Sequence, residues 1–191
     1  MKKVFFILVV SLLLSVGVFA DDTVKIDAIM KPGNMGIYAG IGTGVFWGAL
    51  DFSGGFEAIF SQYDIGDSLP ITFGVAVRGG IFSWKETWVL GDYYYTYLGG
   101  GVFATAHLGF TKDSVPENLQ FLANTDFYVG LGPQFYSYSY GYSSSKVSNF
   151  IIGFGSTGGI NYFLTDNFAI NLEGGYYGYY GGGIIGVLFK F

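Results

Sequence analysis

The chain has no cysteine, a single histidine and only four prolines, and charged residues make up just 12% of its 191 positions. Without cysteine, neither a disulfide framework nor a lipid anchor on an N-terminal cysteine can form. One histidine and no cysteine also argue against a metal site, so we expect no cofactor. A soluble domain of this size has about a quarter charged residues. The low charge therefore separates this chain from ordinary soluble domains.

Basic residues are also scarce, with nine Lys or Arg against 14 Asp or Glu. Lys2 and Lys3 precede an apolar stretch that ends in the cleavage pattern Val18-Phe19-Ala20, which predicts a signal peptide over residues 1–20. An anchoring helix is the weaker alternative, because the run is short of the roughly 20 residues that a membrane helix needs. Cleavage leaves seven basic residues against 14 acidic ones, which argues against a nucleic-acid partner.

Glycine and aromatic residues are abundant instead: 32 glycines, 20 phenylalanines and 16 tyrosines. Residues 21–34, which end in Pro32-Gly33-Asn34, are predicted to be a short periplasmic lead-in outside the main fold. From Met35 to Phe191, apolar residues alternate with glycine, tyrosine or polar residues, which predicts one domain of β-strands. The predicted strands cover residues 35–47, 50–63, 71–84, 93–110, 126–140, 149–165, 168–180 and 183–191. The loops between them are expected to be short, with polar loops at 85–92 and 142–148 and turns at 48–49 and 181–182.

Each predicted strand has one bulky apolar face and one face of glycine, tyrosine, hydroxyl and charged residues. A secreted β-sandwich would bury the apolar face, whereas a membrane barrel would turn it to lipid. Glycine weakens strands unless close packing requires it, as it does inside a narrow eight-stranded barrel. Twelve tyrosines also fall at one rim if the strands run up and down, as aromatic girdles do. They are Tyr93, Tyr94, Tyr95, Tyr97, Tyr136, Tyr138, Tyr140, Tyr142, Tyr176, Tyr177, Tyr179 and Tyr180.

The pattern therefore predicts an all-β fold, an eight-stranded antiparallel up-and-down transmembrane β-barrel. A membrane helix over residues 147–165 is disfavoured by its glycines and its period of two. Because a membrane tolerates no open sheet edge, the last strand must pair with the first, near residues 36–47. In the last strand, Ile185, Val187, Phe189 and Phe191 should face lipid, and Ile184, Gly186, Leu188 and Lys190 the lumen.

The sequence resembles the small outer-membrane β-barrel families of the OmpA, OmpX and OmpW type over residues 35–191. The resemblance rests on the signal peptide, the eight amphipathic segments, the stretch Tyr162-Phe163-Leu164-Thr165-Asp166-Asn167-Phe168 before Asn171-Leu172-Glu173, and the terminal Phe191. It implies export through the periplasm to an outer membrane. It also implies that the end of the chain, with Phe189 and Phe191, resembles the signal read by the barrel-assembly machinery. Unlike OmpA, the chain has no peptidoglycan-binding domain after the barrel.

Three features could carry chemistry. Residues 153–158, Gly-Phe-Gly-Ser-Thr-Gly, match a dinucleotide-binding fingerprint by letter, but the following residues continue a strand rather than open a helix. His107 has no serine at a useful spacing, so a lumenal packing role is favoured over catalysis. The inward charges are expected to form a structural network in which Arg78 bridges Glu57 and Glu173, with a solute filter as the alternative. The predicted lumenal charges are Glu57, Arg78, Asp126, Glu173 and Lys190.

The leading hypothesis from these observations is an outer-membrane barrel that is structural or surface-exposed, monomeric and without enzyme activity. It would contact outer-membrane lipid and, during biogenesis, the assembly machinery; any surface or host ligand is open. The alternatives are a narrow porin-like conduit for small or hydrophobic solutes and a barrel-embedded lipid-modifying enzyme.

Overall fold

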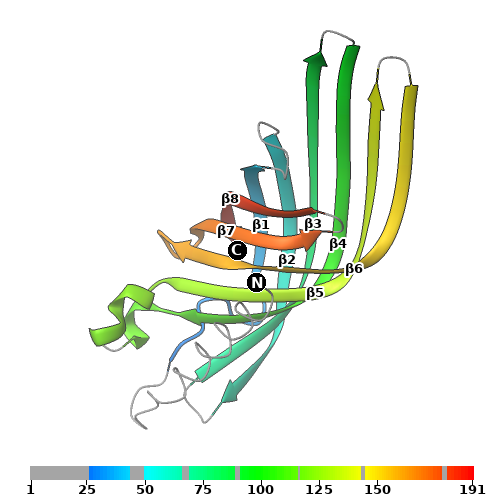
Figure 1. Cartoon of the computed structure of the whole chain (residues 1–191). Coiled ribbons are helices and arrows are strands. Elements are labelled where there is room, and N and C mark those ends of the chain that lie inside the picture. Colours follow the sequence, from blue (N-terminus) through cyan, green and yellow to red (C-terminus); the bar gives the residue numbers. More distant parts are fainter. Residues whose placement is uncertain are drawn as a thin grey trace.

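The computed structural model describes residues 26–43, 50–65, 69–88, 91–115, 117–142, 145–177 and 180–191. The predicted signal peptide and the turn at 48–49 lie outside these residues. Eight antiparallel strands close into a barrel in chain order, which confirms the predicted fold (Figure 1). They are β1 (Met35–Thr43), β2 (Leu50–Ile65), β3 (Leu69–Trp88), β4 (Gly91–Phe110), β5 (Thr125–Tyr142), β6 (Ser145–Phe163), β7 (Phe168–Tyr177) and β8 (Tyr180–Lys190).

The barrel closes between its first and last strands, as the sequence predicted. β1 pairs with β8 from Gly36 opposite Lys190 to Thr43 opposite Gly183. The faces of β8 also divide as expected, because Ile185 is 54% exposed whereas Leu188 is fully buried. The same holds around the barrel: the bulky apolar side chains point outward and are exposed. This arrangement excludes the sandwich, which would bury them.

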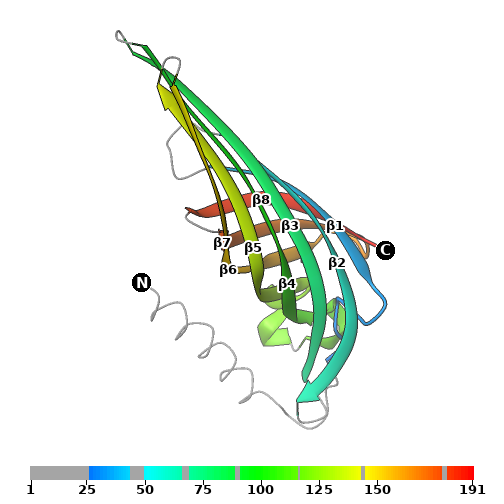
Figure 2. The same ribbon diagram turned by 90° about the vertical axis from the view of Figure 1, so that its right-hand side faces the viewer.

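Two hairpins rise well beyond the rest of the barrel (Figures 1 and 2). β3 and β4 have 20 residues each, and β5 and β6 have 18 and 19, against nine to 11 in β1, β7 and β8. The β2 register stops opposite Phe82, and the β7 register stops opposite Ser156. We call the projecting four-stranded sheet, residues 82–88, 91–97, 136–142 and 145–151, the arm.

The strand pairing corrects three predictions about loops, two of them in the arm. Residues 85–92 and 142–148 were predicted to be polar loops, but most of them continue strands, for example Lys85 opposite Tyr94. Gly181 and Gly182 were predicted to form a turn, but they pair with Tyr176 and Gly175 inside β8. A run of polar residues predicts a loop from sequence, but polar residues also occur in strands of a sheet that is exposed to water.

The predicted lead-in also differs from expectation, because its described part, residues 26–34, packs against one end of the barrel. Ile29 and Met30 are buried with Leu188 and Phe163. The amide of Gly33 donates to the carbonyl of Ile59 over 2.8 Å, and the Lys190 ammonium donates to the carbonyl of Ile29 over 2.9 Å. The segment is therefore part of the fold and covers the lumen at the end opposite the arm.

The β4–β5 connection lies at that same end. It contains two short 3-10 helices, η1 (Lys112–Ser114) and η2 (Glu117–Leu122). No helix among the described residues is long and apolar enough to cross a membrane.

Candidate functional site

The middle of the lumen is filled by polar side chains that the strand register directs inward. Seven of the eight strands contribute at least one of them, and each is less than 10% exposed. Because these groups are buried, each needs hydrogen-bonding partners inside the barrel. The lumenal network consists of Tyr38, Glu57, Arg78, Thr105, His107, Asp126, Tyr128, Asn161, Asn171 and Glu173.

Arg78 lies at the centre of the network and makes both of the predicted bridges. Its Nη2 is 3.1 Å from Glu57 Oε2, and its Nε is 3.1 Å from Glu173 Oε2. The guanidinium carbon lies 3.7 Å from the centre of the Tyr38 ring, within cation–π range. Tyr38 donates its hydroxyl to Glu57 over 2.8 Å, and Tyr128 donates to Glu173. Both carboxylates are thus held by a cation and a phenol.

His107 connects Glu57 to Asp126, the third carboxylate of the network. Its Nδ1 is 3.0 Å from Asp126 Oδ2, and its Nε2 is 2.8 Å from Glu57 Oε1. Its ring stacks on Tyr128 with centroids 5.5 Å apart. Asp126 also accepts a hydrogen bond from Asn161 Nδ2 over 2.9 Å. The histidine therefore links Glu57 to Asp126, a contact that the sequence did not suggest.

Asp126, His107 and Thr105 have the order of a hydrolase triad, with Thr105 Oγ1 3.3 Å from Nε2. A nucleophile must be free to be deprotonated and must reach a substrate. Thr105 instead donates its hydroxyl to Glu57, and all three side chains are buried. This geometry suits a packed network better than a catalytic site.

Two other predicted features lie apart from the network. Lys190 contacts Ile29 at the end opposite the arm and lies 4.9 Å from the centre of the Phe163 ring. The dinucleotide-like residues 153–158 lie inside β6, which continues as a strand to Phe163. Neither the helix nor the turn that pyrophosphate binding needs is present there.

Sequence reasoning also missed Asp51, which lines a small cavity between the network and the arm. Alternation along the predicted strand 50–63 places Asp51 on the inward face but does not reveal a cavity. The signal that could have found the cavity is the set of glycines at matching depths in neighbouring strands, among them Gly40, Gly80 and Gly99.

Comparison with known proteins bears on the fold. No family model and no curated protein matches the chain. Among solved structures, Ail, the attachment invasion locus protein of Yersinia pestis, superposes with a TM-score of 0.56 at 16% identity, over 84% of this chain and 100% of Ail. Ail in complex with the heparin analogue sucrose octasulfate gives 0.55 at 12% identity, over the same shares. The N-terminal β-barrel domain of Pseudomonas aeruginosa OprF gives 0.51 at 19% identity, over 84% of this chain and 98% of that domain. With its closed ring of eight strands, the chain has the fold of the small eight-stranded outer-membrane β-barrels.

Proposed function

We propose that this protein is an outer-membrane β-barrel with a blocked lumen, and that its role is structural or surface-exposed rather than enzymatic. The observation that carries the proposal is the lumenal network, in which Arg78 and His107 join carboxylates from β2, β5 and β7. The side chains of the network come from seven strands and are each less than 10% exposed, which supports a lumen that is blocked at this level.

The outer surface supports placement in a lipid bilayer. Ile81, Leu98 and Phe150 are exposed apolar side chains in one register row, whose fourth member is Ser137. The next row toward the arm tip is hydroxylic: Ser83 lies 3.2 Å from Thr96, and Ser139 lies 2.9 Å from Ser148. A change from mainly apolar to hydroxyl side chains between two successive rows suits the edge of a membrane's apolar layer.

The arm supports a surface role. It extends from the end of the barrel opposite the N-terminal segment, and its hydroxylic outward row suits water. With the N-terminal end in the periplasm, the arm stands outside the cell. Phe191 then lies at the periplasmic interface, where its backbone pairs with Met35 over 2.9 Å, consistent with the proposed assembly signal at Phe189 and Phe191. We propose a monomer surrounded by outer-membrane lipid.

The substitution Arg78→Met tests the role of the network. It leaves Glu57 and Glu173 buried without their cation, so the free energy of unfolding should fall by about 3–5 kcal/mol. The measurement is urea unfolding in lipid vesicles, followed by heat-modifiable migration on gels. Val77→Met is the matched control, because Val77 is 49% exposed on the outer face of the same strand.

Planar-bilayer recording separates the blocked barrel from the conduit. The wild-type protein should give no conductance, and deletion of the protein should leave uptake of hydrophobic solutes unchanged. A wild-type current, or an Arg78→Met protein that folds normally but changes ion selectivity, would favour the conduit. Modified lipid A in cells that produce the protein, but not in its absence, would favour the enzyme.

A further inference from the structure

A cavity of about 40 Å³ lies in the lumen between the network and the arm. We call it the vestibule. Gly40, Ser53, Gly80 and Gly99 form one register row across β1 to β4 and line it. The row above holds Asp51, Phe82 and Tyr97, and the row below holds Arg78. The glycines let Ile184 lie against Gly40 and Tyr97 against Gly99, so these two side chains border the cavity.

Asp51 is the carboxylate of this vestibule, and it differs from the other three in the lumen. Glu57 and Glu173 each contact Arg78, Asp126 contacts His107, and each of the three accepts at least one further hydrogen bond. Asp51 makes no hydrogen bond or ion pair with any described residue, and it is half-buried. Its Oδ1 lies 3.3 Å from the position that a Cβ on Gly80 would occupy, so the carboxylate lies over the glycine row.

The charges around the vestibule favour a cation. Its charged lining residues are the carboxylates of Asp51 and Glu173 and the guanidinium of Arg78, which already pairs with Glu173. The lining therefore carries one more negative than positive charge, and the unpaired one is Asp51. A narrow lumen with low-dielectric walls strengthens the attraction for a positive ligand.

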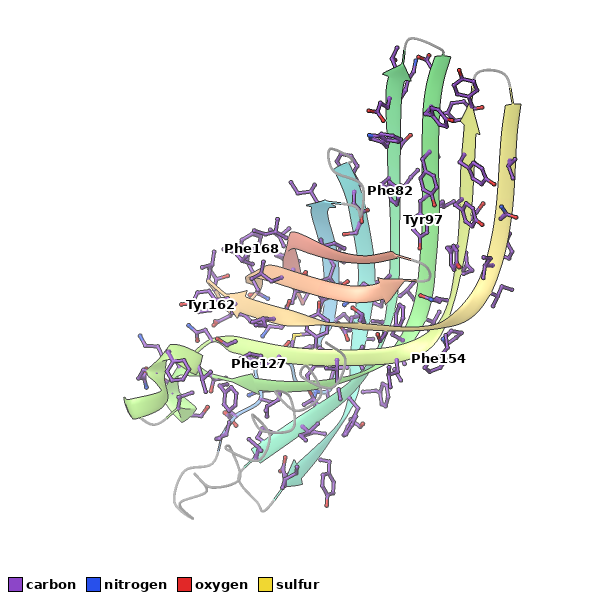
Figure 3. All side chains as sticks on the ribbon, in the orientation of Figure 1. Phe82, Tyr97, Phe127, Phe154, Tyr162 and Phe168 are labelled. Carbon is purple, nitrogen blue, oxygen red and sulfur yellow. The ribbon has the colours of Figure 1, made fainter. Side chains whose placement is uncertain are left out.

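The walls of the vestibule select what kind of cation fits. Tyr97 lines it from the arm side and stacks on Phe82 with ring centroids 5.3 Å apart (Figure 3). Ile184 lines the opposite wall. One carboxylate with the Ser53 hydroxyl accepts the N–H groups of an ammonium, whereas a calcium ion takes about six to eight oxygen ligands. The aromatic and aliphatic walls suit an alkyl tail.

We propose that the vestibule binds the primary ammonium group of a small aliphatic amine, with Asp51 as its counter-ion and its tail along Tyr97 toward the arm. A water needs about 10–15 Å³ by the same measure, so the vestibule holds an ammonium and one or two waters. A quaternary trimethylammonium head has no N–H group to donate to Asp51 or Ser53. This inference goes beyond the proposed function, which requires no lumenal ligand.

Isothermal titration calorimetry of the full folded protein in detergent micelles tests the proposal, with n-butylamine hydrochloride as the probe at constant ionic strength. The wild-type protein should bind it, and Asp51→Asn should weaken binding at least about tenfold, because a neutral amide replaces the charged acceptor. The matched control is Asp113→Asn, which removes one negative charge from an exposed position at the other end of the barrel. It should bind as the wild type does.

Two further comparisons keep the test decisive. Gly80→Ala places a methyl group in the vestibule and should also weaken binding, while heat-modifiable migration reports that each variant folds. Tetramethylammonium chloride should give no binding to the wild type. No heat from butylamine with the wild type, equal affinity in Asp51→Asn, or equal binding of tetramethylammonium would each overturn the proposal. The proposed function is tested separately, by the conductance and unfolding measurements described above.

Discussion

Gly132 and Gly153 both belong to the lumenal face, on the neighbouring strands β5 and β6, yet their surroundings differ. A Cβ on Gly132 would lie 1.9 Å from the backbone oxygen of Val102, which cannot move without the sheet. A Cβ on Gly153 would meet nothing within 4 Å. Composition alone does not distinguish the two glycines. Gly132 lies where the pairing of β4 with β5 is interrupted, whereas Gly153 pairs regularly with Gln134.

The substitution Gly132→Ala should therefore lower the free energy of unfolding by about 1–3 kcal/mol, as overpacking does. Gly153→Ala should change it by less than about 0.5 kcal/mol, because the new methyl group has room. Urea unfolding in lipid vesicles measures both under the same conditions. Equal losses of unfolding free energy in the two variants would mean that the close contact at Gly132 does not affect stability.

The lumenal residues also mark how far the sequence could predict the site. Alternation gave the inward direction of Glu57, Arg78 and Glu173, and the pairing of neighbouring strands placed Glu57 beside Arg78. The partners of His107 could not be predicted in the same way. Glu57 lies 50 residues away on a strand that does not pair with β4, so their contact depends on the shear of the closed barrel.

At the scale of elements, the arm is stiffened by a ladder of aromatic rings on its lumenal face. Phe82, Tyr95, Tyr97 and Tyr136 form a buried cluster, and Tyr138 packs against it. Tyr138 stacks on Tyr95, Tyr136 and Tyr140 with centroids 6.2 to 6.3 Å apart. Ring stacking across strands replaces the support that neighbouring strands give inside the barrel. The sequence placed these tyrosines at one rim. The polar residues on the outward face led to a prediction of loops where the structure has strands.

Removing the Tyr138 ring should loosen the arm and leave the barrel intact. Each aromatic pair contributes about 0.5–1.5 kcal/mol beyond the area it buries, so Tyr138→Ala loses several such contacts at once. Amide hydrogen exchange should become faster in the arm and stay unchanged in β1, β7 and β8. Thr96→Ala, on the outward face of the same sheet, is the control and should leave arm exchange near the wild-type rate. Faster exchange throughout the barrel would contradict a local role for the ladder.

At the scale of the whole molecule, the two ends of the barrel are built differently. One end has the arm, whose strands continue beyond the apolar belt. The other end is covered by Ile29 and Met30 and has the turn with η1. Because the two ends differ, the barrel has a defined orientation in our proposal: the arm lies outside the cell and η1 lies in the periplasm.

The absence of cysteine from the chain makes this orientation directly testable, because any introduced cysteine is the only one. Glu86 is exposed in the arm, and Asp113 is exposed in η1. On intact cells, a membrane-impermeant maleimide should label Glu86→Cys and spare Asp113→Cys, which should react only after the outer membrane is permeabilised. Ala76→Cys, at a fully buried position, should react only after unfolding. Labelling of Asp113→Cys but not Glu86→Cys on intact cells would show the opposite orientation. Equal labelling of both variants in a soluble periplasmic fraction would contradict the membrane location.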